Sequence, residues 1–573
     1  MFHINDLLGN YGGGGSSQIT LISQGICEFY SNKSLEIEKI SISEIVRELK
    51  LSKETARRKL NELTKDGIIA RDKKKNYDSR DTHGEIITMG QTASRVAGYS
   101  ATTLIILYGL AQIGRKVSNK FDGTYFTITS IMTAIVSPII RPLTSGASLP
   151  KNLKALEPDF FTDKLRKCGA IKNSKVTEAV VTPFAAGQTS DSAKVTLTYD
   201  KDEQSKTTEQ PSSIVVKMSR EDTEGRVLNM MLGLWRECNF YGTRSNMIPK
   251  EMAIPKSYYT YVNSINNDFI LLLSDATTRN GKNMKADILT PPSTYYGVTE
   301  YVNERPDPTV PPPEIVASIT VPKKNVAQAA KAIAKMHAKF WGDSSLLNDT
   351  SLNLTKPTHA NLFAGIYAGA WPKTKQLVEE HYGHFKWRGE EKLMLETVQF
   401  SLDYICDPAN MVSNRPFGYT LCHGDFHGQN ILRVSEEDGS DESLVYLDWQ
   451  IIQVGEGIRD VAYMIAQTCP PYYRRKYEKD IVRVWYDELI KEGVDEKSYP
   501  FELAWSRYKF WCVVGWCAII GLSSSLKKIY ETPQGTNAYI YNALCDLVID
   551  AVKTHGTVKD NLAEAHRILN NSK

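Results

Sequence analysis

Polar side chains that can hold a metal ion and orient a hydroxyl group gather between residues 423 and 448. The run His423-Gly424-Asp425-Phe426-His427-Gly428-Gln429-Asn430 is followed, eighteen residues after Asn430, by Asp448 at the end of an apolar strand. A carboxylate can accept the proton of a hydroxyl group, and carboxylate and amide oxygens are suitable ligands for Mg²⁺. The pattern therefore predicts a centre for phosphoryl transfer. We expect Asp425 to be the catalytic group and Asn430 and Asp448 to be the metal ligands.

A β-hairpin is expected to bring the two metal ligands together. Residues 431–434 and 444–447 have the composition of strands, and the polar turn between them contains Asp438-Gly439. Such a hairpin folds Asp448 back beside Asn430. Asp425 and Asn430 are also five residues apart, which is the spacing of the catalytic Asp and the metal-binding Asn in the protein-kinase loop.

Two other interpretations of the same run stay open. A buried His423 and Asp425 that hold a loop together would explain those two residues, but not Asn430 and Asp448. Alternatively, His423, Asp425 and His427 form an H-x-D-x-H run that could bind a transition metal. That site would need a further ligand, and the sequence offers no additional His or Cys cluster nearby.

Several segments resemble a known family in the expected order. Residues 421–432 and Leu447-Asp448-Trp449-Gln450 are similar to the ecdysteroid-kinase-like (choline-kinase-like) branch of the aminoglycoside phosphotransferase superfamily. Residues 149–166 resemble its opening helix, and residues 333–341 resemble its "LAxxHAxxW" helix. The resemblance runs from about residue 150 to the C-terminus. It implies an α+β, bilobal protein-kinase-like fold with ATP and Mg²⁺ as cofactors, His423 as a support of the catalytic loop and Asp460 as its buttress.

A lysine at the end of a strand is the candidate for binding phosphates. Ile214-Val215-Val216-Lys217 is a short β-branched run, typical of a buried strand, although such a lysine is often merely solvated. The family places a Glu before a Phe-Tyr pair in a nearby helix. The resemblance therefore implies that Glu237, ahead of Phe240-Tyr241, forms an ion pair that positions Lys217.

Two further nucleotide contacts are expected in the smaller lobe. The loop 183–191 joins two predicted strands, 176–181 and 194–199, and matches a loop that covers phosphates through Gly187 and Ser190. It is not G-x-G-x-x-G, but small residues still allow backbone N–H groups to approach an anion. The strand 269–273 runs into Ser274-Asp275-Ala276, where the resemblance implies an inter-lobe hinge that binds adenine through Ser274 and Ala276. A buried strand followed by a turn is the simpler alternative.

The composition is that of an ordinary globular protein. The chain has 573 residues, 42% hydrophobic content and a formal net charge of +3, so overall charge favours no class of partner. Nine Cys without a C-x-x-C pair, and no signal-peptide pattern at the start, indicate reduced thiols in the cytoplasm. The apolar stretches 103–110 and 128–140 are short or interrupted, so we expect no membrane span.

The N-terminal region carries an excess of basic residues and a different pattern. Ser41-Ile42-Ser43-Glu44 is a capping box that opens one helix, and residues 52–65 predict a second helix with Arg57, Arg58 and Lys59 among its polar positions. A β-hairpin wing is expected from the following segments, which are 68–71, the basic run 73–75 and 85–88. The stretch resembles a winged helix-turn-helix, best over residues 40–90, and indicates possible contact with DNA. Many such modules bind proteins instead.

We therefore expect a winged-helix-like region at 1–146, a kinase-like N-lobe at 147–275 and a C-lobe with the catalytic loop at 276–573. The polar, Pro-rich segment 277–313 is interpreted as an inter-lobe insertion, more a surface loop than a lid. The predicted function is an ATP-dependent kinase for a small-molecule hydroxyl group. The alternative is a DNA-binding regulator whose kinase-like domain senses a ligand without catalysis. The presence of Lys217, Asp425, Asn430 and Asp448 favours the enzyme.

Overall fold

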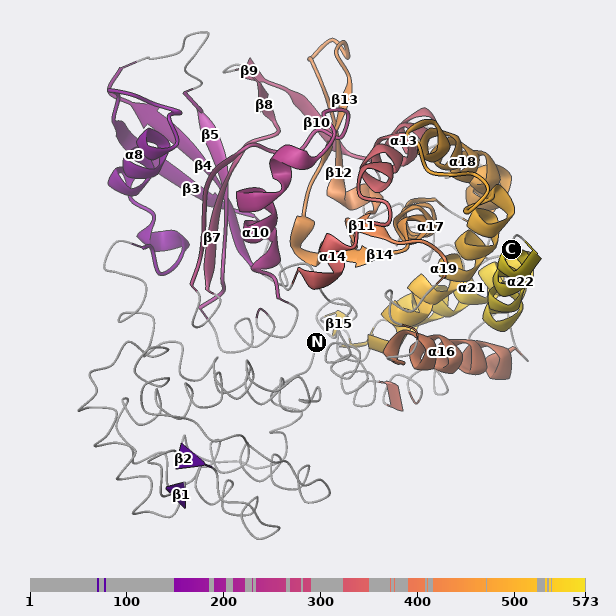
Figure 1. The fold of residues 1–573 in the computed structure, drawn as a ribbon. Helices are drawn as coiled ribbons and strands as arrows, with labels where there is room; N and C mark the ends of the chain where they lie inside the picture. Colours follow the sequence, from indigo (N-terminus) through magenta and orange to yellow (C-terminus); the bar gives the residue numbers. More distant parts are fainter. Residues whose placement is uncertain are drawn as a thin grey trace.

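The computed structural model describes most of residues 149–571 and, before them, only two short strands. Within 149–571 it leaves out residues 185–189, 202–209, 222–228, 230–232, 264–267, 280–281, 290–322, 350–370, 373–375, 377–389, 408–409, 411–415, 470, 523–530, 533–534 and 537. Most helices lie in one part of this region and the largest antiparallel sheet lies in the other (Figure 1). The α+β class predicted from the sequence is confirmed.

A five-stranded antiparallel sheet with the order β3-β4-β5-β7-β6 forms one part of the molecule. Its strands are β3 (Val176–Pro183), β4 (Asp191–Tyr199), β5 (Ser213–Met218), β6 (Ser257–Val262) and β7 (Phe269–Ser274). Successive side chains of a strand point to opposite faces of the sheet. In β5, Ile214, Val216 and Met218 are buried in a cluster with Phe161. Lys217 therefore lies on the opposite face.

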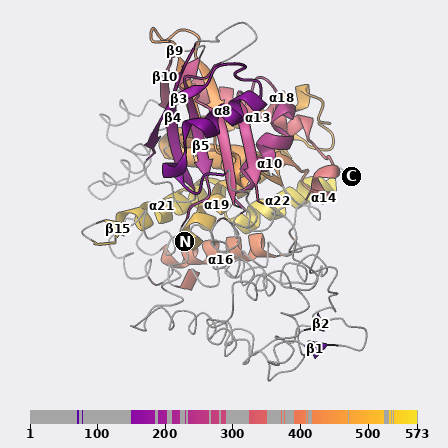
Figure 2. The same cartoon turned by 90° about the vertical axis from the view of Figure 1, so that its left-hand side faces the viewer.

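Helix α8 (Pro158–Lys167) covers the first of these faces (Figure 2). It begins with a proline, whose missing N–H is not needed at the first position of a helix. Phe161 and Leu165, one turn apart, are fully buried against the strands. The preceding short helix η1 (Leu153–Ala155) is capped by Asn152, whose side chain accepts from the N–H groups of Lys154 and Ala155. The helix expected over residues 149–166 is thus present as two pieces.

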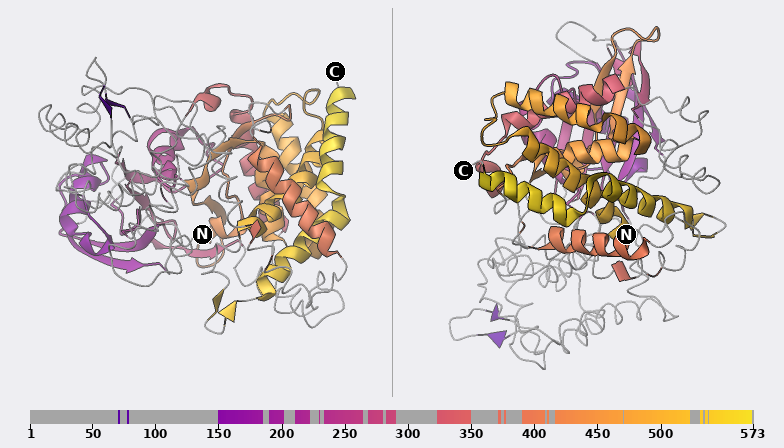
Figure 3. Two further views of the ribbon diagram at one scale, coloured as in Figure 1. Left: turned by 90° about the horizontal axis from the view of Figure 1, so that it is seen from below. Right: turned by 90° about the vertical axis from the view of Figure 1, so that its right-hand side faces the viewer.

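The larger part is helical and shares a second hydrophobic cluster with the other face of the sheet. Leu271 and Leu273 of β7 join this cluster, so the two parts are continuous in their packing. Its longer helices are α13 (Lys323–Lys339), α16 (Glu391–Cys406), α17 (Gly457–Thr468), α18 (Pro471–Lys491), α19 (Phe501–Leu522), α21 (Ala538–His555) and α22 (Val558–Asn571). The shorter helix α10 (Arg236–Thr243) packs against β6 and against the segment 449–451. Figure 3 shows that the C-terminal helices lie on the side away from the sheet.

A predicted hairpin and an unpredicted strand form a small sheet between these parts, in the order β10-β12-β13. Strands β12 (Ile431–Ser435) and β13 (Ser443–Tyr446) are the hairpin expected between Asn430 and Asp448. Strand β10 (Lys285–Ile288) pairs with β12. The interpretation of 277–313 as a surface loop is therefore wrong for 285–288, and also for β8 (Thr278–Arg279) and β9 (Lys282–Asn283), which pair with each other. This strand alternates exposed and half-buried residues because only one of its faces meets protein. Residues 290–313 lie outside the described part.

The N-terminal region is described at four residues only. Strand β1 (Ala70–Arg71) pairs with β2 (Tyr77–Asp78). The end of the first expected wing strand is thus a strand, and its partner begins two residues after the basic run 73–75. The expected second strand at 85–88 and both expected helices lie outside the described residues. In the part of the chain that is described, no helix combines the length and apolar character required to span a bilayer.

Candidate active site

The loop that carries Asp425 is fixed by a buried carboxylate of α17. Asp460 accepts hydrogen bonds from the backbone N–H of His423 at 2.7 Å and of Gly424 at 3.0 Å. Burial disfavours the charged form of Asp460 and so raises its pKa. The hydrogen bond from His337, the charges of the two histidines and the Gly424 N–H outweigh burial, so the pKa lies below the ordinary value. The backbone of Gly424 has φ +86°, and a Cβ there would lie 2.1 Å from the Ile451 carbonyl oxygen. The loop therefore requires glycine at this position.

The imidazole of His423 supports the loop from inside. Its Nδ1 accepts the backbone N–H of Asp425 at 3.3 Å, so the proton of the neutral ring lies on Nε2, which donates to the Leu447 carbonyl oxygen at 2.9 Å. Burial lowers the pKa of His423, although the charges of Asp460 and Asp425 oppose the shift. The ring is therefore neutral at physiological pH. It ties the loop to the residue before Asp448 and takes a supporting role.

Asp425 and Asn430 lie in direct contact. The amide Nδ2 of Asn430 donates to the backbone oxygen of Asp425 at 3.0 Å and lies 3.2 Å from Oδ2 of its carboxylate. His427 Nε2 lies 3.5 Å from Asp425 Oδ1. Burial raises the pKa of Asp425, but hydrogen bonding and charge from His427, together with His423 and Asn430, hold that pKa below its ordinary value. Asp425 is thus ionised at neutral pH. Because the Asn430 amide contacts Asp425 through Nδ2, its side-chain oxygen Oδ1 is the candidate metal ligand.

The hairpin positions Asp448 beside Asn430, as the spacing predicted. Ile431 pairs with Tyr446, and the N–H of Leu447 donates to the backbone oxygen of Asn430 at 2.9 Å. Asp448 has the left-handed backbone conformation, φ 62° and ψ 66°, which is uncommon for a residue other than glycine. This turn ends the strand. Gln450 Nε2 donates to Asp448 Oδ2 at 3.3 Å.

Lys217 bridges two carboxylates that come from different parts of the fold. Its Nζ lies 2.7 Å from Glu237 Oε2 and 2.9 Å from Asp448 Oδ1. Burial disfavours the ammonium, but the charges of Asp448 and Glu237 outweigh it and raise the pKa of Lys217. The pKa of Glu237 is raised by burial and by the charge of Asp448, because two carboxylates share one ammonium. The ion pair between Lys217 and Glu237 that the resemblance implied is present.

Helix α10 orients Glu237 and contacts the segment after Asp448. Glu237 Oε1 accepts the backbone N–H of Trp449 at 3.3 Å. One turn further along the helix, the Phe240 ring stacks on the Trp449 indole with centroids 4.3 Å apart and an angle of 9°. Trp449 is fully buried, and the His423 ring lies 4.4 Å from its indole. Trp449 therefore contacts the Glu237 helix, the Asp448 turn and the catalytic loop.

The charge and donor set of this cluster fit a divalent cation. Lys217 carries one positive charge against the carboxylates of Glu237, Asp448 and Asp425, so the formal balance is negative. Carboxylate and amide oxygens are the ligands that Mg²⁺ prefers, and Asp448 and Asn430 offer them without a thiol or imidazole. Asp448 and Asn430 therefore have the donor chemistry that would suit a magnesium ion.

The other predicted nucleotide contacts are placed only in part. Gly187 lies outside the described residues, whereas Ser190 is buried beside the start of β4, with its hydroxyl 3.3 Å from that of Ser192. Ser274 donates its N–H to the Lys256 oxygen at 2.8 Å, and its hydroxyl accepts the Lys256 N–H at 2.9 Å. The backbone N–H and the hydroxyl of Ser274 thus both form hydrogen bonds with Lys256, the residue before β6. Ala276 follows in the turn after β7 and is half-buried.

A buried carboxylate that the sequence analysis did not single out fixes this turn. Asp275 forms an ion pair with Lys194 at 2.8 Å and accepts hydrogen bonds from Ser213 and from both the N–H and the hydroxyl of Thr277. Burial raises its pKa, but Lys194 and these hydrogen bonds outweigh burial and hold the pKa below its ordinary value. In β4, Lys194 lies opposite Val215 and so shares the sheet face of Lys217.

The alternative of a transition metal at His423, Asp425 and His427 finds no support. Both ring nitrogens of His423 are engaged in the loop. Among the described residues, two other groups have metal-ligand chemistry, namely His337, Cys422 and Asp460, and Glu478, Cys512 and His555.

A guanidinium group already occupies the centre of the second of these groups. Arg474 Nη1 lies 2.8 Å from His555 Nε2, 3.1 Å from Glu478 Oε2 and 3.5 Å from Cys512 Sγ. The Arg474 guanidinium thus occupies the position that a metal ion would take between these three side chains. Its contacts link α18, α19 and α21.

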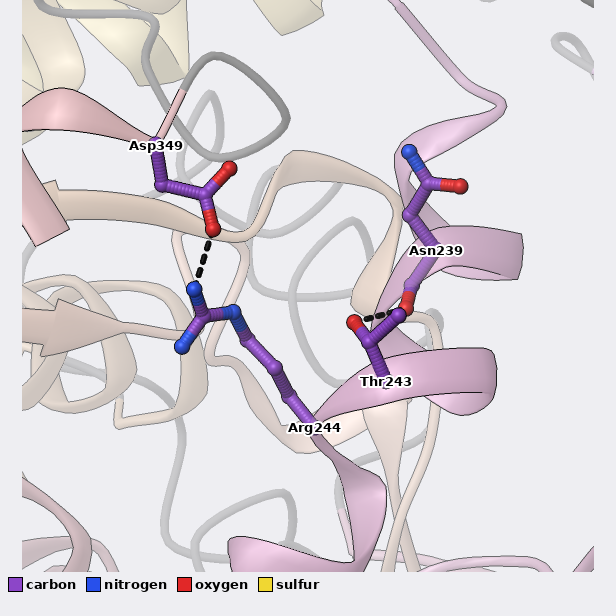
Figure 4. A pocket seen from close by; sticks show the side chains of 4 residues that line it. All are labelled: Asn239, Thr243, Arg244 and Asp349. Atoms are coloured by element: carbon purple, nitrogen blue, oxygen red, sulfur yellow. Dashed lines mark hydrogen bonds and ion pairs between the residues drawn. The ribbon is translucent and has the colours of Figure 1, made fainter.

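A cavity of about 450 Å³ lies at the C-terminal end of α10, away from the first turn that carries Glu237. Its described lining consists of Asn239, Thr243, Arg244 and Asp349 (Figure 4). The guanidinium of Arg244 points to the carboxylate of Asp349 and forms an ion pair with it, while the Thr243 hydroxyl donates to the Asn239 carbonyl oxygen. None of these side chains belongs to the cluster around Asp448.

The motifs of the loop and hairpin coincide with a known family. Residues 325–495 match the Ecdysteroid kinase-like family. The matched region contains Asp425, Asn430 and Asp448, so the resemblance predicted from the motifs is confirmed there. Residues 35–73 match the DeoR-like helix-turn-helix domain, as the N-terminal pattern predicted. No curated protein sequence matches the chain.

Solved structures of small-molecule kinases align with the larger part of the chain. Choline kinase LicA from Streptococcus pneumoniae is 13% identical, with 69% of this chain and 98% of that chain covered and a TM-score of 0.35. A choline/ethanolamine kinase family protein from Mesorhizobium loti is 11% identical, with 71% and 99% covered and a TM-score of 0.34.

Proposed function

We propose that the chain is a phosphotransferase that uses ATP and Mg²⁺ to phosphorylate a hydroxyl group of a small molecule. The observation that carries the proposal is the contact of Lys217 with the carboxylates of Glu237 and Asp448, next to a loop that presents Asp425 and Asn430. The match of residues 325–495 to the Ecdysteroid kinase-like family supports it.

Each residue of the cluster has a role that follows from its contacts. Asp448 and Asn430 would hold the Mg²⁺, which when bound neutralises charge on the phosphates. Lys217 would bind phosphate oxygens, and Glu237 keeps its ammonium oriented from a helix. Lys217 lies 2.9 Å from Asp448, so the group that would bind phosphate lies directly beside a group that would hold the metal.

Asp425 would orient the acceptor hydroxyl and receive its proton. The acceptor oxygen forms a bond to the γ-phosphorus, the bond from that phosphorus to the bridging oxygen breaks, and ADP leaves with the electron pair. The hydroxyl proton passes to the Asp425 carboxylate and then to solvent. The lowered pKa of Asp425 keeps the carboxylate ionised and ready for this step at neutral pH.

The smaller lobe would supply the rest of the nucleotide site. The loop 183–191, with Gly187 and Ser190, would cover the phosphates, and the turn at Ser274 to Ala276 would contact the adenine through backbone groups. Lys194 lies on the same sheet face as Lys217, and its ion pair with Asp275 would keep this turn in place.

The proposal is tested with the full-length chain in two steps. Calorimetry with MgATP measures nucleotide binding, and an ATP-consumption screen against a panel of hydroxylated small molecules looks for an acceptor, with Asp425→Asn as the inactive control. We expect MgATP to bind to both proteins and an acceptor to stimulate ATP consumption by the wild type alone. No magnesium-dependent nucleotide binding would overturn the proposal.

A second candidate function rests on the N-terminal match. The DeoR-like helix-turn-helix at residues 35–73 supports contact of residues 40–90 with duplex DNA, either beside the kinase activity or as part of a regulator that only senses a ligand. An electrophoretic mobility shift with the whole chain at two salt concentrations tests it, because phosphate contacts weaken as salt rises. A salt-sensitive shift without ATP consumption would favour the regulator.

A further inference from the structure

A chain of hydrogen bonds leads from helix α18 to the loop that carries Asp425. Trp485 Nε1 donates to His337 Nδ1 at 3.0 Å, and His337 Nε2 lies 3.3 Å from Asp460 Oδ2. Asp460 in turn accepts the N–H groups of His423 and Gly424. Trp485 and His337 are fully buried and Asp460 almost so. The chain crosses three helices, α18, α13 and α17, before it reaches the loop.

The tryptophan fixes the direction of the two side-chain hydrogen bonds in which His337 takes part. An indole N–H is a donor only, so His337 Nδ1 must be the acceptor. The neutral imidazole then carries its proton on Nε2, which is the tautomer that donates to Asp460. The other tautomer would turn a lone pair toward the carboxylate. Trp485 therefore selects the form of His337 that supports Asp460.

The packing around His337 leaves the ring little freedom. Thr420, at the start of the strand that leads into the loop, donates its hydroxyl to the His337 backbone oxygen at 2.7 Å. A Cβ at Gly457 would lie 2.8 Å from His337 Nδ1, so the start of α17 approaches the ring closely because this residue is glycine. The His337 ring packs edge to face on the Trp485 indole, with ring centroids 6.0 Å apart.

We propose that Trp485 and His337 are positioning residues, which through Asp460 hold the backbone at 423–424 and thereby fix the place of the Asp425 carboxylate. Neither side chain touches the cluster around Lys217 and Asp448 directly. The catalytic consequence rests on the proposed function, whereas the effect on the loop backbone does not.

Hydrogen–deuterium exchange of the full-length chain measures the backbone effect directly. In Trp485→Phe and His337→Leu we expect the amides of a peptide covering 421–428 to exchange roughly three- to tenfold faster, the effect of losing about one hydrogen bond. His337→Gln should remain close to wild type, because its amide offers one acceptor and one donor. Trp371→Phe is the matched control, since its indole N–H donates to Gln399 outside this chain of bonds.

The outcomes separate positioning from general stability. Faster exchange confined to the loop and the start of α17, with rescue in His337→Gln, supports the proposal. Unchanged loop exchange in Trp485→Phe and His337→Leu overturns it, as does equal acceleration over the whole chain. The thermal unfolding midpoint of each variant checks that the fold is retained.

A catalytic readout on the same variants tests the functional part. We expect Trp485→Phe to lower kcat for ATP consumption several-fold with little change in KM for MgATP, because Lys217 and Asp448 are held by other elements. An effect on KM alone would contradict positioning of Asp425. If the wild type binds no MgATP, the proposed function fails, while the exchange result still decides whether these residues hold the loop.

Discussion

The ring of Phe240 lies flat on the indole of Trp449, with centroids 4.3 Å apart. Phe240 belongs to the helix that carries Glu237, and Trp449 follows Asp448 directly. The stacking therefore links the helix that orients Lys217 to the turn at Asp448, the proposed metal ligand, so that neither can move far without the other.

Phe240→Leu should loosen this link while keeping an apolar side chain. We expect a loss of about 1 kcal/mol in the free energy of unfolding from the aromatic pair and a several-fold weaker affinity for MgATP, measured by calorimetry. Phe510→Leu is the control, because Phe510 is fully buried and packs edge to face on Trp511, within the helical part. Equal loss of MgATP affinity in both variants would show that stability alone is responsible.

Asp425→Asn should separate binding from transfer. The amide keeps the size of the side chain but cannot accept the hydroxyl proton, so we expect turnover to fall by roughly 10²–10⁴-fold. MgATP affinity should change little, since the metal ligands remain. Radiolabelled phosphate transfer and calorimetry measure the two quantities. Asp480→Asn, an exposed carboxylate of α18, serves as the control, and near-normal turnover in Asp425→Asn would refute its role.

Asp448→Asn removes the charge of the side chain while keeping the backbone conformation of the turn. Asparagine tolerates the left-handed region that Asp448 occupies, so the turn should survive while a metal-binding oxygen loses its charge. We expect the Mg²⁺ concentration for half-maximal nucleotide binding to rise by roughly tenfold or more. Asp441→Asn is closely matched, because Asp441 also has positive φ but lies at the exposed tip of the hairpin. An equal response of both variants would argue against Asp448 as a ligand.

His423 should make folding stability depend on pH in the mildly acidic range. Burial holds its pKa below the ordinary value of 6.5, so below that pH the unfolded chain takes up a proton that the folded chain does not. Its contribution is complete above about 6.5 and is lost as the pH falls toward the lower folded pKa. Thermal unfolding midpoints between pH 7.5 and 5 should therefore fall less steeply in His423→Asn than in the wild type.

The matched control for this measurement is His566→Gln, because His566 is exposed on α22. A profile of His566→Gln that changes as much as that of His423→Asn would show that the effect is not specific to His423. Asp425 and Asp460 do not contribute to the pH dependence of stability in this range. Because their pKa values are lowered, their contribution to stability is complete above about pH 3.8 and is lost only as the pH falls further. Identical profiles for His423→Asn and the wild type would rule out a buried neutral His423.

Features encoded within a short stretch of sequence could be predicted. The hairpin between Asn430 and Asp448, the strand that ends near Lys217 and the helix that carries Glu237 each follow from local periodicity, spacing or a family motif. The contact of Lys217 with Glu237 came from the resemblance. Its second contact, with Asp448, joins residues 231 positions apart.

Features that depend on distant pairing could not be predicted. Strand β10 alternates polar and half-buried residues, and nothing within 285–288 indicates that β12 is its partner. Likewise, Trp485 and His337 are 148 positions apart. His337 lies in the family motif at 333–341, but nothing in the sequence pairs it with Trp485. Lys194 and Asp275 also meet only through the sheet register.

The hairpin between Asn430 and Asp448 is held on both edges by segments that precede it in the chain. Strand β10 bonds to β12, and on the other side the Tyr446 N–H donates to the Ala253 oxygen at 2.9 Å. A rotation of the sheet against the helices would therefore pull on the hairpin from two directions. Under the proposed function, such a rotation would act on Asn430 and Asp448 at the two ends of the hairpin, so nucleotide release and metal release would be linked.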